Sequence, residues 1–185
     1  MNAWVLYSTN QHDVETAARL LKKALEPEYK VKIELMNAKS TEPEIFITKD
    51  TGIVVIGAPF MGRNWGRGAA KYLKKINDAA KKEAWTGVVG IYVVRPPELN
   101  AGLLKDSIEK QARKLDIFPH VCRPVLDLLL KPLEKKGSKS DTPVDIDTLD
   151  GQASGKITSY AKELKAFAKE ILQEDEQHKG ELKKK

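Results

Sequence analysis

The residues of this chain best suited to bind an anion are the polar ones at 8–13, which follow an apolar run and precede a helical pattern. They are Ser8, Thr9, Asn10, Gln11, His12 and Asp13. Such a loop offers side-chain donors, and the helix after it offers unpaired N–H groups and the positive end of its dipole. This segment therefore predicts a phosphate-type anion site. A plain helix cap, with Asp13, Ser8 or Thr9 as the capping residue, is the alternative.

A second chemically distinctive group lies at 58–68, where three glycines and two aromatic residues follow an apolar strand pattern. The candidate site residues in it are Pro59, Phe60, Met61, Gly62, Arg63, Asn64 and Trp65. The glycines predict a shaped loop whose backbone can approach a ligand closely. Phe60 and Trp65 would give flat apolar cover to a planar ring, with Arg63 as a cation beside it. Alternatively, Phe60 and Met61 fill the core, and Trp65 packs against the start of the next helix.

A third loop follows the apolar run at 88–94 and adds Val94, Arg95 and Pro96 to the candidate site. Metal ligands are not predicted, because the histidines at 12, 120 and 178 lack the spacing of a metal site. We expect His120 at the surface and His178 in a solvated tail. Because Cys122 is the single cysteine and begins an apolar run, we interpret it as a small core residue.

Strand and helix patterns alternate along the chain and must position these loops. Apolar runs predict strands at 3–7, 31–35, 52–57, 88–94 and 121–130, and amphipathic patterns predict helices at 13–25, 69–80, 103–115 and from 157 onward. This order predicts a doubly wound, five-stranded parallel sheet in a three-layer α/β/α arrangement, with 31–35 as an edge strand. Ligands of such sheets lie outside the C-terminal strand ends, so the three loops should meet in one pocket.

The bulk composition indicates one globular domain over residues 1–173, followed by a charged, mobile tail at 174–185. The 185 residues are 41% hydrophobic and 31% charged, and no apolar run is long enough to cross a membrane. The lack of a signal peptide and of disulfides predicts a cytoplasmic location. The net charge of +6 is spread as lysine pairs along helical patterns, with no nucleic-acid-binding motif. We therefore expect no nucleic-acid partner, whereas peripheral contact with an anionic membrane surface is compatible with the charge.

Several of these segments resemble flavodoxins, and in detail the chain is similar to the flavodoxin-like, quinone-linked protoporphyrinogen oxidases of bacteria. Leu6-Tyr7-Ser8-Thr9 matches the strand that enters that family's phosphate loop. Val55-Ile56-Gly57-Ala58-Pro59 matches the strand before the second flavin loop, and Tyr72-Leu73-Lys74-Lys75 matches the helix after it. Pro119 and Cys122 match residues near the fifth strand. The match spans most of residues 3–130 and the last helix.

The resemblance implies non-covalent FMN, with the phosphate held by residues 8–14 and the ring between residues 59–65 and 94–97. It implies an electron carrier or a small FMN-dependent oxidoreductase, acting with a redox partner or a quinone. The chain departs from the family where His12, Asp13 and Val14 replace a glycine, a variable residue and a threonine, so we expect weak FMN binding. The lack of aromatic residues at 131–155 argues against porphyrin oxidation. A flavin-free module that binds a partner or another anionic ligand is the second hypothesis.

Overall fold

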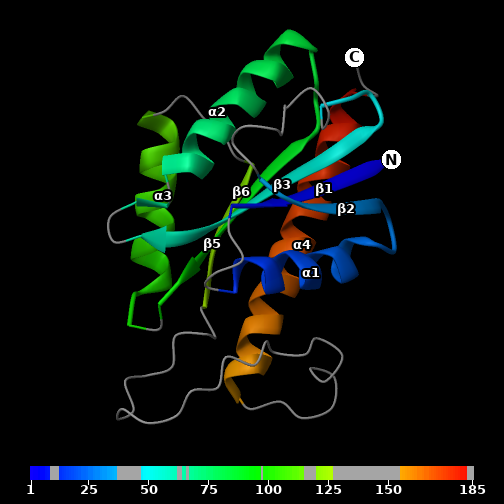
Figure 1. Ribbon diagram of the computed structural model, residues 1–185. Coiled ribbons are helices and arrows are strands. Elements are labelled where there is room, and N and C mark those ends of the chain that lie inside the picture. The colour runs from blue at the N-terminus through cyan, green and yellow to red at the C-terminus, as the bar shows by residue number, and fades with distance from the viewer. Residues whose placement is uncertain are drawn as a thin grey trace.

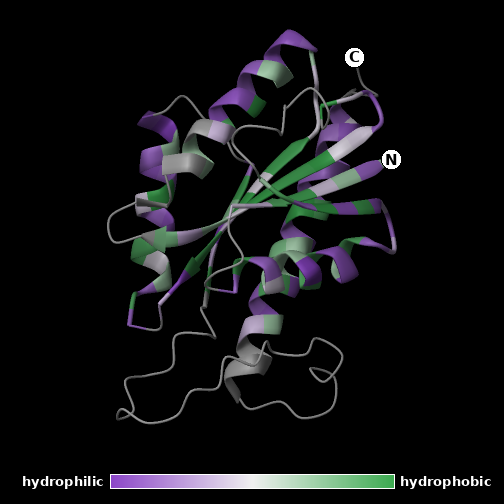
Figure 2. Cartoon of the chain, viewed as in Figure 1, coloured by the Kyte–Doolittle hydropathy of each residue, from purple (hydrophilic) through white to green (hydrophobic). Residues whose placement is uncertain are grey.

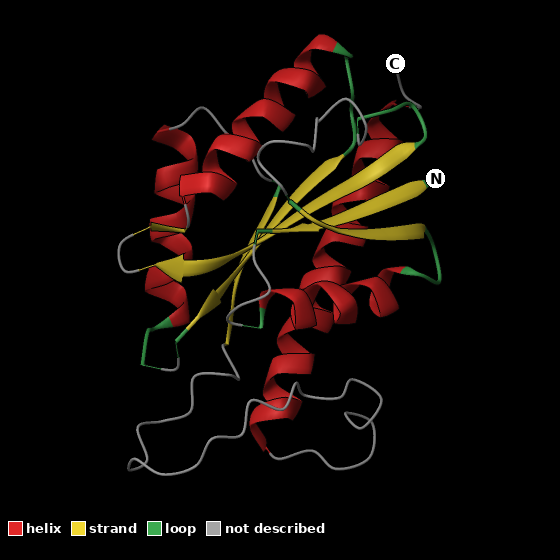
Figure 3. Ribbon diagram, in the orientation of Figure 1, coloured by secondary structure: helices red, strands yellow, loops and turns green. Residues whose placement is uncertain are grey.

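The computed structural model describes residues 1–8, 13–36, 47–61, 64–65, 67–96, 98–114, 120–126 and 155–182. Its elements, in chain order, are β1 (Asn2–Tyr7), α1 (Val14–Leu25), β2 (Lys30–Leu35), β3 (Thr51–Met61), β4 (Asn64–Trp65), α2 (Arg67–Lys82), β5 (Val88–Arg95), α3 (Ala101–Lys114), β6 (Val121–Leu126) and α4 (Gly155–Leu182). Helices and strands alternate as the hydrophobic patterns predict, and Figure 3 shows the strands gathered between the helices.

The main sheet is parallel and has the strand order β2-β1-β3-β5-β6, with the short β4 paired antiparallel to β3. The predicted fold class is confirmed. The chain runs from β1 outward to β2 and then returns to the other side of β1 to continue with β3. This reversal makes the boundary between β1 and β3 the switch point, where open sheets of this kind bind ligands.

Helices cover both faces of the sheet, with α2 and α3 on one side and α1 and α4 on the other (Figure 1). Successive strand residues point to opposite faces, so each strand contributes to two cores. Leu6 and Ile56 pack with residues of α2 and α3, whereas Val5 and Val55 pack with α1 and α4. Figure 2 shows the consequence, a hydrophobic sheet between helices whose outer sides are hydrophilic.

β2 and β6 are the edge strands of the main sheet. The prediction of an edge strand at 31–35 is confirmed, because β2 lies at one end of the sheet and pairs only with β1 among the described strands. β6 lies at the other end, and Pro124 lies inside it opposite Val93. A proline has no backbone N–H to donate to a neighbouring strand, which explains why Pro124 is tolerated in an edge strand.

Two expectations from the sequence are wrong. Residues 58–61 were expected to begin a loop, but they continue β3 and form a hairpin in which Phe60 pairs with Trp65 and Met61 pairs with Asn64. Residues 174–182 were expected to form a tail, but they continue α4 to Leu182. The reason is tertiary contact, because Asp175 is only 4% exposed and accepts a hydrogen bond from the Tyr29 hydroxyl.

Candidate functional site

The three predicted loops leave the sheet at its C-terminal edge, the line along which the parallel strands end, because the strands before them are parallel and in register. Tyr7 lies beside Gly57, and Pro59 lies beside Val94. The backbone N–H of Ser8 donates to the Gly57 carbonyl at 3.0 Å, which attaches the start of the first loop to β3. The described residues also exclude part of the predicted site, namely Thr9, Asn10, Gln11, His12, Gly62 and Arg63. Only the backbone positions of Met61, Asn64 and Trp65 are described.

The start of α1 is held in place by two buried tyrosines that come from distant elements. The Tyr92 hydroxyl, from β5, donates to the Val14 carbonyl at 2.6 Å. The Tyr160 hydroxyl, from α4, donates to the Asp13 carbonyl at 3.1 Å. Both tyrosines are 0% exposed. Burial, with smaller contributions from Tyr7 and Glu15, raises the pKa of Tyr92 well above its usual value, so this phenol stays a neutral donor.

Gly57 makes room for one of these tyrosines. A Cβ atom added at Gly57 would lie 2.0 Å from Cζ of Tyr92, its neighbour on β5. Only glycine at position 57 therefore lets the Tyr92 ring lie over β3 and reach the start of α1. Sequence reasoning missed the roles of Tyr92 and Tyr160. The available signal was a glycine at the end of a central strand, together with tyrosines in otherwise apolar patterns.

Asp13 occupies the N-cap position of α1 in the left-handed conformation, with φ of 55°. Its side chain makes no capping hydrogen bond, so the alternative in which the Asp13 side chain caps the helix does not hold. The residue is only 2% exposed, and its carbonyl accepts the first hydrogen bond of the helix from the Ala17 N–H at 2.9 Å. Aspartate tolerates this backbone conformation better than most residues. The result places a buried carboxyl group at the positive end of the α1 dipole.

The described residues of the other two loops differ in how far they are buried. Phe60 is half-buried and packs against the core of the α2 and α3 side, as the alternative interpretation predicted. Val94 is only 2% exposed and belongs to the core between the sheet, α1 and α4. Pro59 is buried and Pro96 is half-buried. Val94 and part of Phe60 therefore serve packing, and ligand contact by the residues of these two loops stays a prediction.

Arg95 places a shielded cation at this edge. Its Nη1 donates to the Leu99 carbonyl at 2.8 Å, and its Nη2 lies 3.8 Å from the Glu163 carboxylate of α4. The side chain is 12% exposed, and its buried Nε has no hydrogen-bond partner among the described residues. A buried donor without a partner is costly. An acceptor that a ligand brought to this edge would remove that cost.

The described part of the chain contains two of the histidines and the single cysteine. No group of three or more histidine, cysteine, aspartate or glutamate residues there could hold a metal ion. None of its helices is long and apolar enough to span a bilayer.

His178 is not in a solvated tail as expected, because its ring meets that of His120 edge-to-face, with centroids 4.7 Å apart. Cys122 is buried, and burial raises the pKa of its thiol to about 12, which agrees with its interpretation as a core residue.

Comparison with known proteins shows the fold of the chain. No family model and no curated protein sequence matches it. The rubredoxin:oxygen oxidoreductase of Desulfovibrio gigas shares 15% identity at a TM-score of 0.57, over 96% of this chain and 36% of that one. Flavodoxin 2 of Bacillus cereus shares 10% identity at a TM-score of 0.57, over 94% of this chain and 99% of that one. A short-chain flavodoxin associated with a PDU bacterial microcompartment shares 14% identity at a TM-score of 0.53, over 95% and 99%.

The chain thus has the flavodoxin fold. It spans about a third of the oxidoreductase and nearly the whole length of the two flavodoxins. None of these three structures bears on the finer resemblance to protoporphyrinogen oxidases.

Proposed function

We propose that the protein binds FMN non-covalently at the C-terminal edge of its sheet and acts as a redox protein. The observation that carries this proposal is the position of the α1 N-terminus at the switch point between β1 and β3, in a chain with the fold of flavodoxins. FMN, when bound, supplies one-electron and two-electron redox chemistry. The protein supplies the binding surface, the orientation of the ring and the local charge.

In this proposal the phosphate lies at the start of α1, beside the loop that begins at Ser8. The N–H groups of the first helical turn and the helix dipole favour an anion there. Tyr92 and Tyr160 fix the helix start through its carbonyl groups, so that its N–H groups hold a constant direction. The ring lies between the β3–β4 hairpin and residues 95–96. Arg95 provides a cation beside it, with an Nε that has no hydrogen-bond partner among the described residues.

Asp13 opposes phosphate binding and makes the expected affinity low. Its carboxyl is buried at the helix start, so solvent screens it poorly. A like charge about 4 Å away at an effective dielectric of about 20 costs about 4 kcal/mol. FMN should therefore bind more weakly than such a site allows without the acid.

A titration of the protein with FMN, followed by quenching of flavin fluorescence, tests the proposal. We expect saturable quenching, and tighter binding in Asp13→Asn because that variant removes the repelling charge. The matched control is Asp106→Asn, which removes an exposed acid from α3 and should leave the affinity unchanged. No saturable quenching at about 100 μM FMN, which corresponds to about −5.5 kcal/mol, would overturn the proposal.

A flavin-free module that binds a partner or another anionic ligand is the second candidate. The observation that favours it is that Val94 lies in one core, Phe60 packs against the other, and Asp13 is buried at the proposed anion position. The same titration separates the two candidates. Within the first, a quinone or a redox partner is the expected electron acceptor, and the net charge of +6 suits an anionic docking surface such as a membrane.

A further inference from the structure

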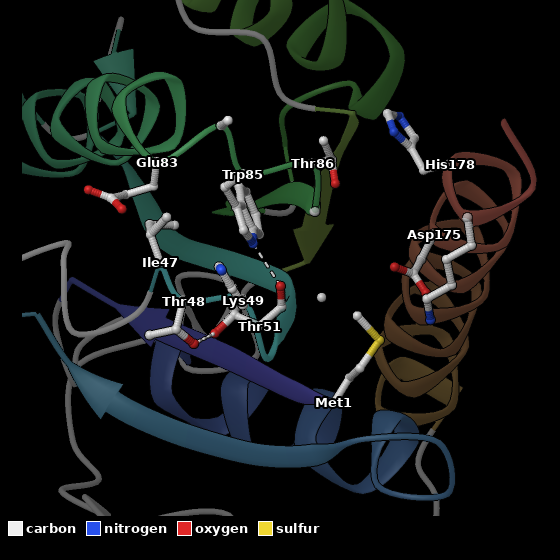
Figure 4. Close-up of a pocket in the computed structure, with 14 residues that line it drawn as sticks. Met1, Ile47, Thr48, Lys49, Thr51, Glu83, Trp85, Thr86, Asp175 and His178 are labelled. Carbon is white, nitrogen blue, oxygen red and sulfur yellow. Dashed lines mark hydrogen bonds and ion pairs between the residues drawn. The ribbon is translucent and has the colours of Figure 1, made fainter. Parts of the chain in front are cut away.

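A pocket of about 440 Å³ lies at the N-terminal edge of the sheet, where the strands begin, opposite the proposed flavin site. Its floor is the start of β3, at Thr51 and Gly52, together with Gly87 just before β5. Figure 4 shows Trp85 on one side of the pocket and Asp175, from α4, on the other. The volume falls within the range of small-molecule sites. Nothing in the proposed flavin function uses this edge.

Trp85 presents its ring to the pocket because three separate features fix it. The indole N–H donates to the Thr51 carbonyl at 2.7 Å, which ties the ring to β3. Gly87 lies under the ring, since a Cβ added there would lie 2.1 Å from an indole carbon. The turn before Trp85 holds Ala84 at φ of 49°, a left-handed conformation that is strained for alanine. This is the usual left-handed residue after a helix end, and with the Trp85 N–H bonded to the Ala80 carbonyl at 2.9 Å it fixes where Trp85 leaves α2.

The opposite wall carries a buried carboxylate with one oxygen in use and one to spare. Oδ2 of Asp175 accepts from the Tyr29 hydroxyl and lies 2.5 Å from the Lys179 ammonium. Oδ1 has no hydrogen-bond donor among the residues that the structure describes, and it lies 3.6 Å from where a Cβ on Gly52 would be. Asp175 as a whole is 4% exposed. The wall thus offers a ligand one fixed acceptor whose charge Lys179 already balances.

We propose that this pocket binds a planar nitrogen heterocycle with an exocyclic amino group, of the nucleobase type. The ring stacks on the face of Trp85, which every base can do because every base has a π-face. The amino group donates to Oδ1 of Asp175, the carboxylate oxygen to which none of the described residues donates. Gly52 and Gly87 let the rings of Tyr29 and Trp85 lie directly on the starts of the strands, because a Cβ atom added at either glycine would lie within 3.0 Å of one of those rings. This site is independent of the flavin site, because the two lie at opposite edges of the sheet.

The test is a calorimetric titration of the full-length protein with adenosine and, separately, with purine riboside, which is the same nucleoside without the amino group. We expect adenosine to saturate the protein with a Kd of about 1 mM or below, and purine riboside to bind about tenfold more weakly. This comparison tests the role of Asp175 without mutating a residue that the fold needs. Trp85→Leu should weaken adenosine binding about fivefold or more. Trp4→Leu, in the β1 core, is the matched control and should leave the affinity unchanged.

Three outcomes of the nucleoside titrations would overturn the proposal. They are no saturable heat with adenosine at about 5 mM, equal affinity for the two nucleosides, and unchanged affinity in Trp85→Leu. Saturating FMN provides a further check, because it should not displace adenosine from a site at the opposite edge. Displacement would mean that one site takes both ligands, which also overturns the proposal. Failure of FMN to bind at all would bear on the proposed function and leave the adenosine result intact.

Discussion

Replacing Gly57 with alanine should destabilise the protein strongly, because the new methyl group would occupy the place of the Tyr92 ring. The Cβ would lie 2.0 Å from Cζ, 2.1 Å from the hydroxyl oxygen and 2.5 Å from Cε2 of Tyr92. The ring cannot move freely, because Tyr92 is 0% exposed and meets Phe167 edge-to-face with centroids 6.2 Å apart. The substitution therefore forces either strain or the loss of the Tyr92 bond to Val14.

The expected magnitude has two contributions. Overpacking of a core costs about 1–3 kcal/mol, and a buried hydroxyl left without a partner costs about 1–3 kcal/mol. We expect Gly57→Ala to lower the free energy of unfolding by about 4 kcal/mol in urea denaturation followed by circular dichroism. Gly180→Ala in α4 is the matched control, because a Cβ there meets nothing within 4 Å. It should raise the stability by about 0.5–1 kcal/mol, the ordinary gain of alanine over glycine in a helix.

A double-mutant cycle identifies the clash itself. Tyr92→Val alone leaves a cavity and costs stability, but it also clears the space that the methyl group at position 57 needs. The double variant Gly57→Ala/Tyr92→Val should therefore be more stable than the sum of the single changes predicts, by about 2 kcal/mol. Additive effects, or a cost of Gly57→Ala below about 1 kcal/mol, would refute the reasoning.

Three further predictions concern single residues. Ala84→Gly should stabilise the protein by about 1 kcal/mol in urea denaturation, because Ala84 is exposed and left-handed at the end of α2; a loss of stability would contradict the strain argued for that turn. Cys122 is 6% exposed with its pKa raised by burial to about 12, so Ellman's reagent at pH 8 should react with it only after unfolding; rapid reaction of the native protein would be inconsistent with this. Burial, and then the Asp175 hydrogen bond, raise the pKa of Tyr29 to about 12, so its contribution is complete below about pH 10, the unfolded value, and is lost as the pH rises through 12. The stability difference between the native protein and Tyr29→Phe should shrink over that interval, and a difference that stays constant from pH 8 to 12 would disprove the assignment.

The sequence by itself determined the secondary structure and the layer arrangement of this protein. The periodicity of hydrophobic residues is a local property of the sequence. The residues of each element therefore predicted its type, as in the buried β3 and β5, the alternating β2 and the amphipathic α1. The parallel sheet then followed from the alternation of strands and helices. That topology also placed the three loops at one edge, because parallel strands end on the same side.

Only the tertiary structure decided which side chains a ligand could reach at the C-terminal edge of the sheet and which residues meet at its N-terminal edge. Pairing of Phe60 with Trp65 turned an expected loop into a hairpin, and helix packing on the sheet buried Val94 and part of Phe60. α4 continues past residue 174 because of Asp175, whose partner Tyr29 is 146 residues away in the chain. The two walls of the second pocket, Trp85 and Asp175, likewise come from distant parts of the chain. Contacts between residues so far apart leave no periodicity in the sequence, and their energies appear only when the fold brings the residues together.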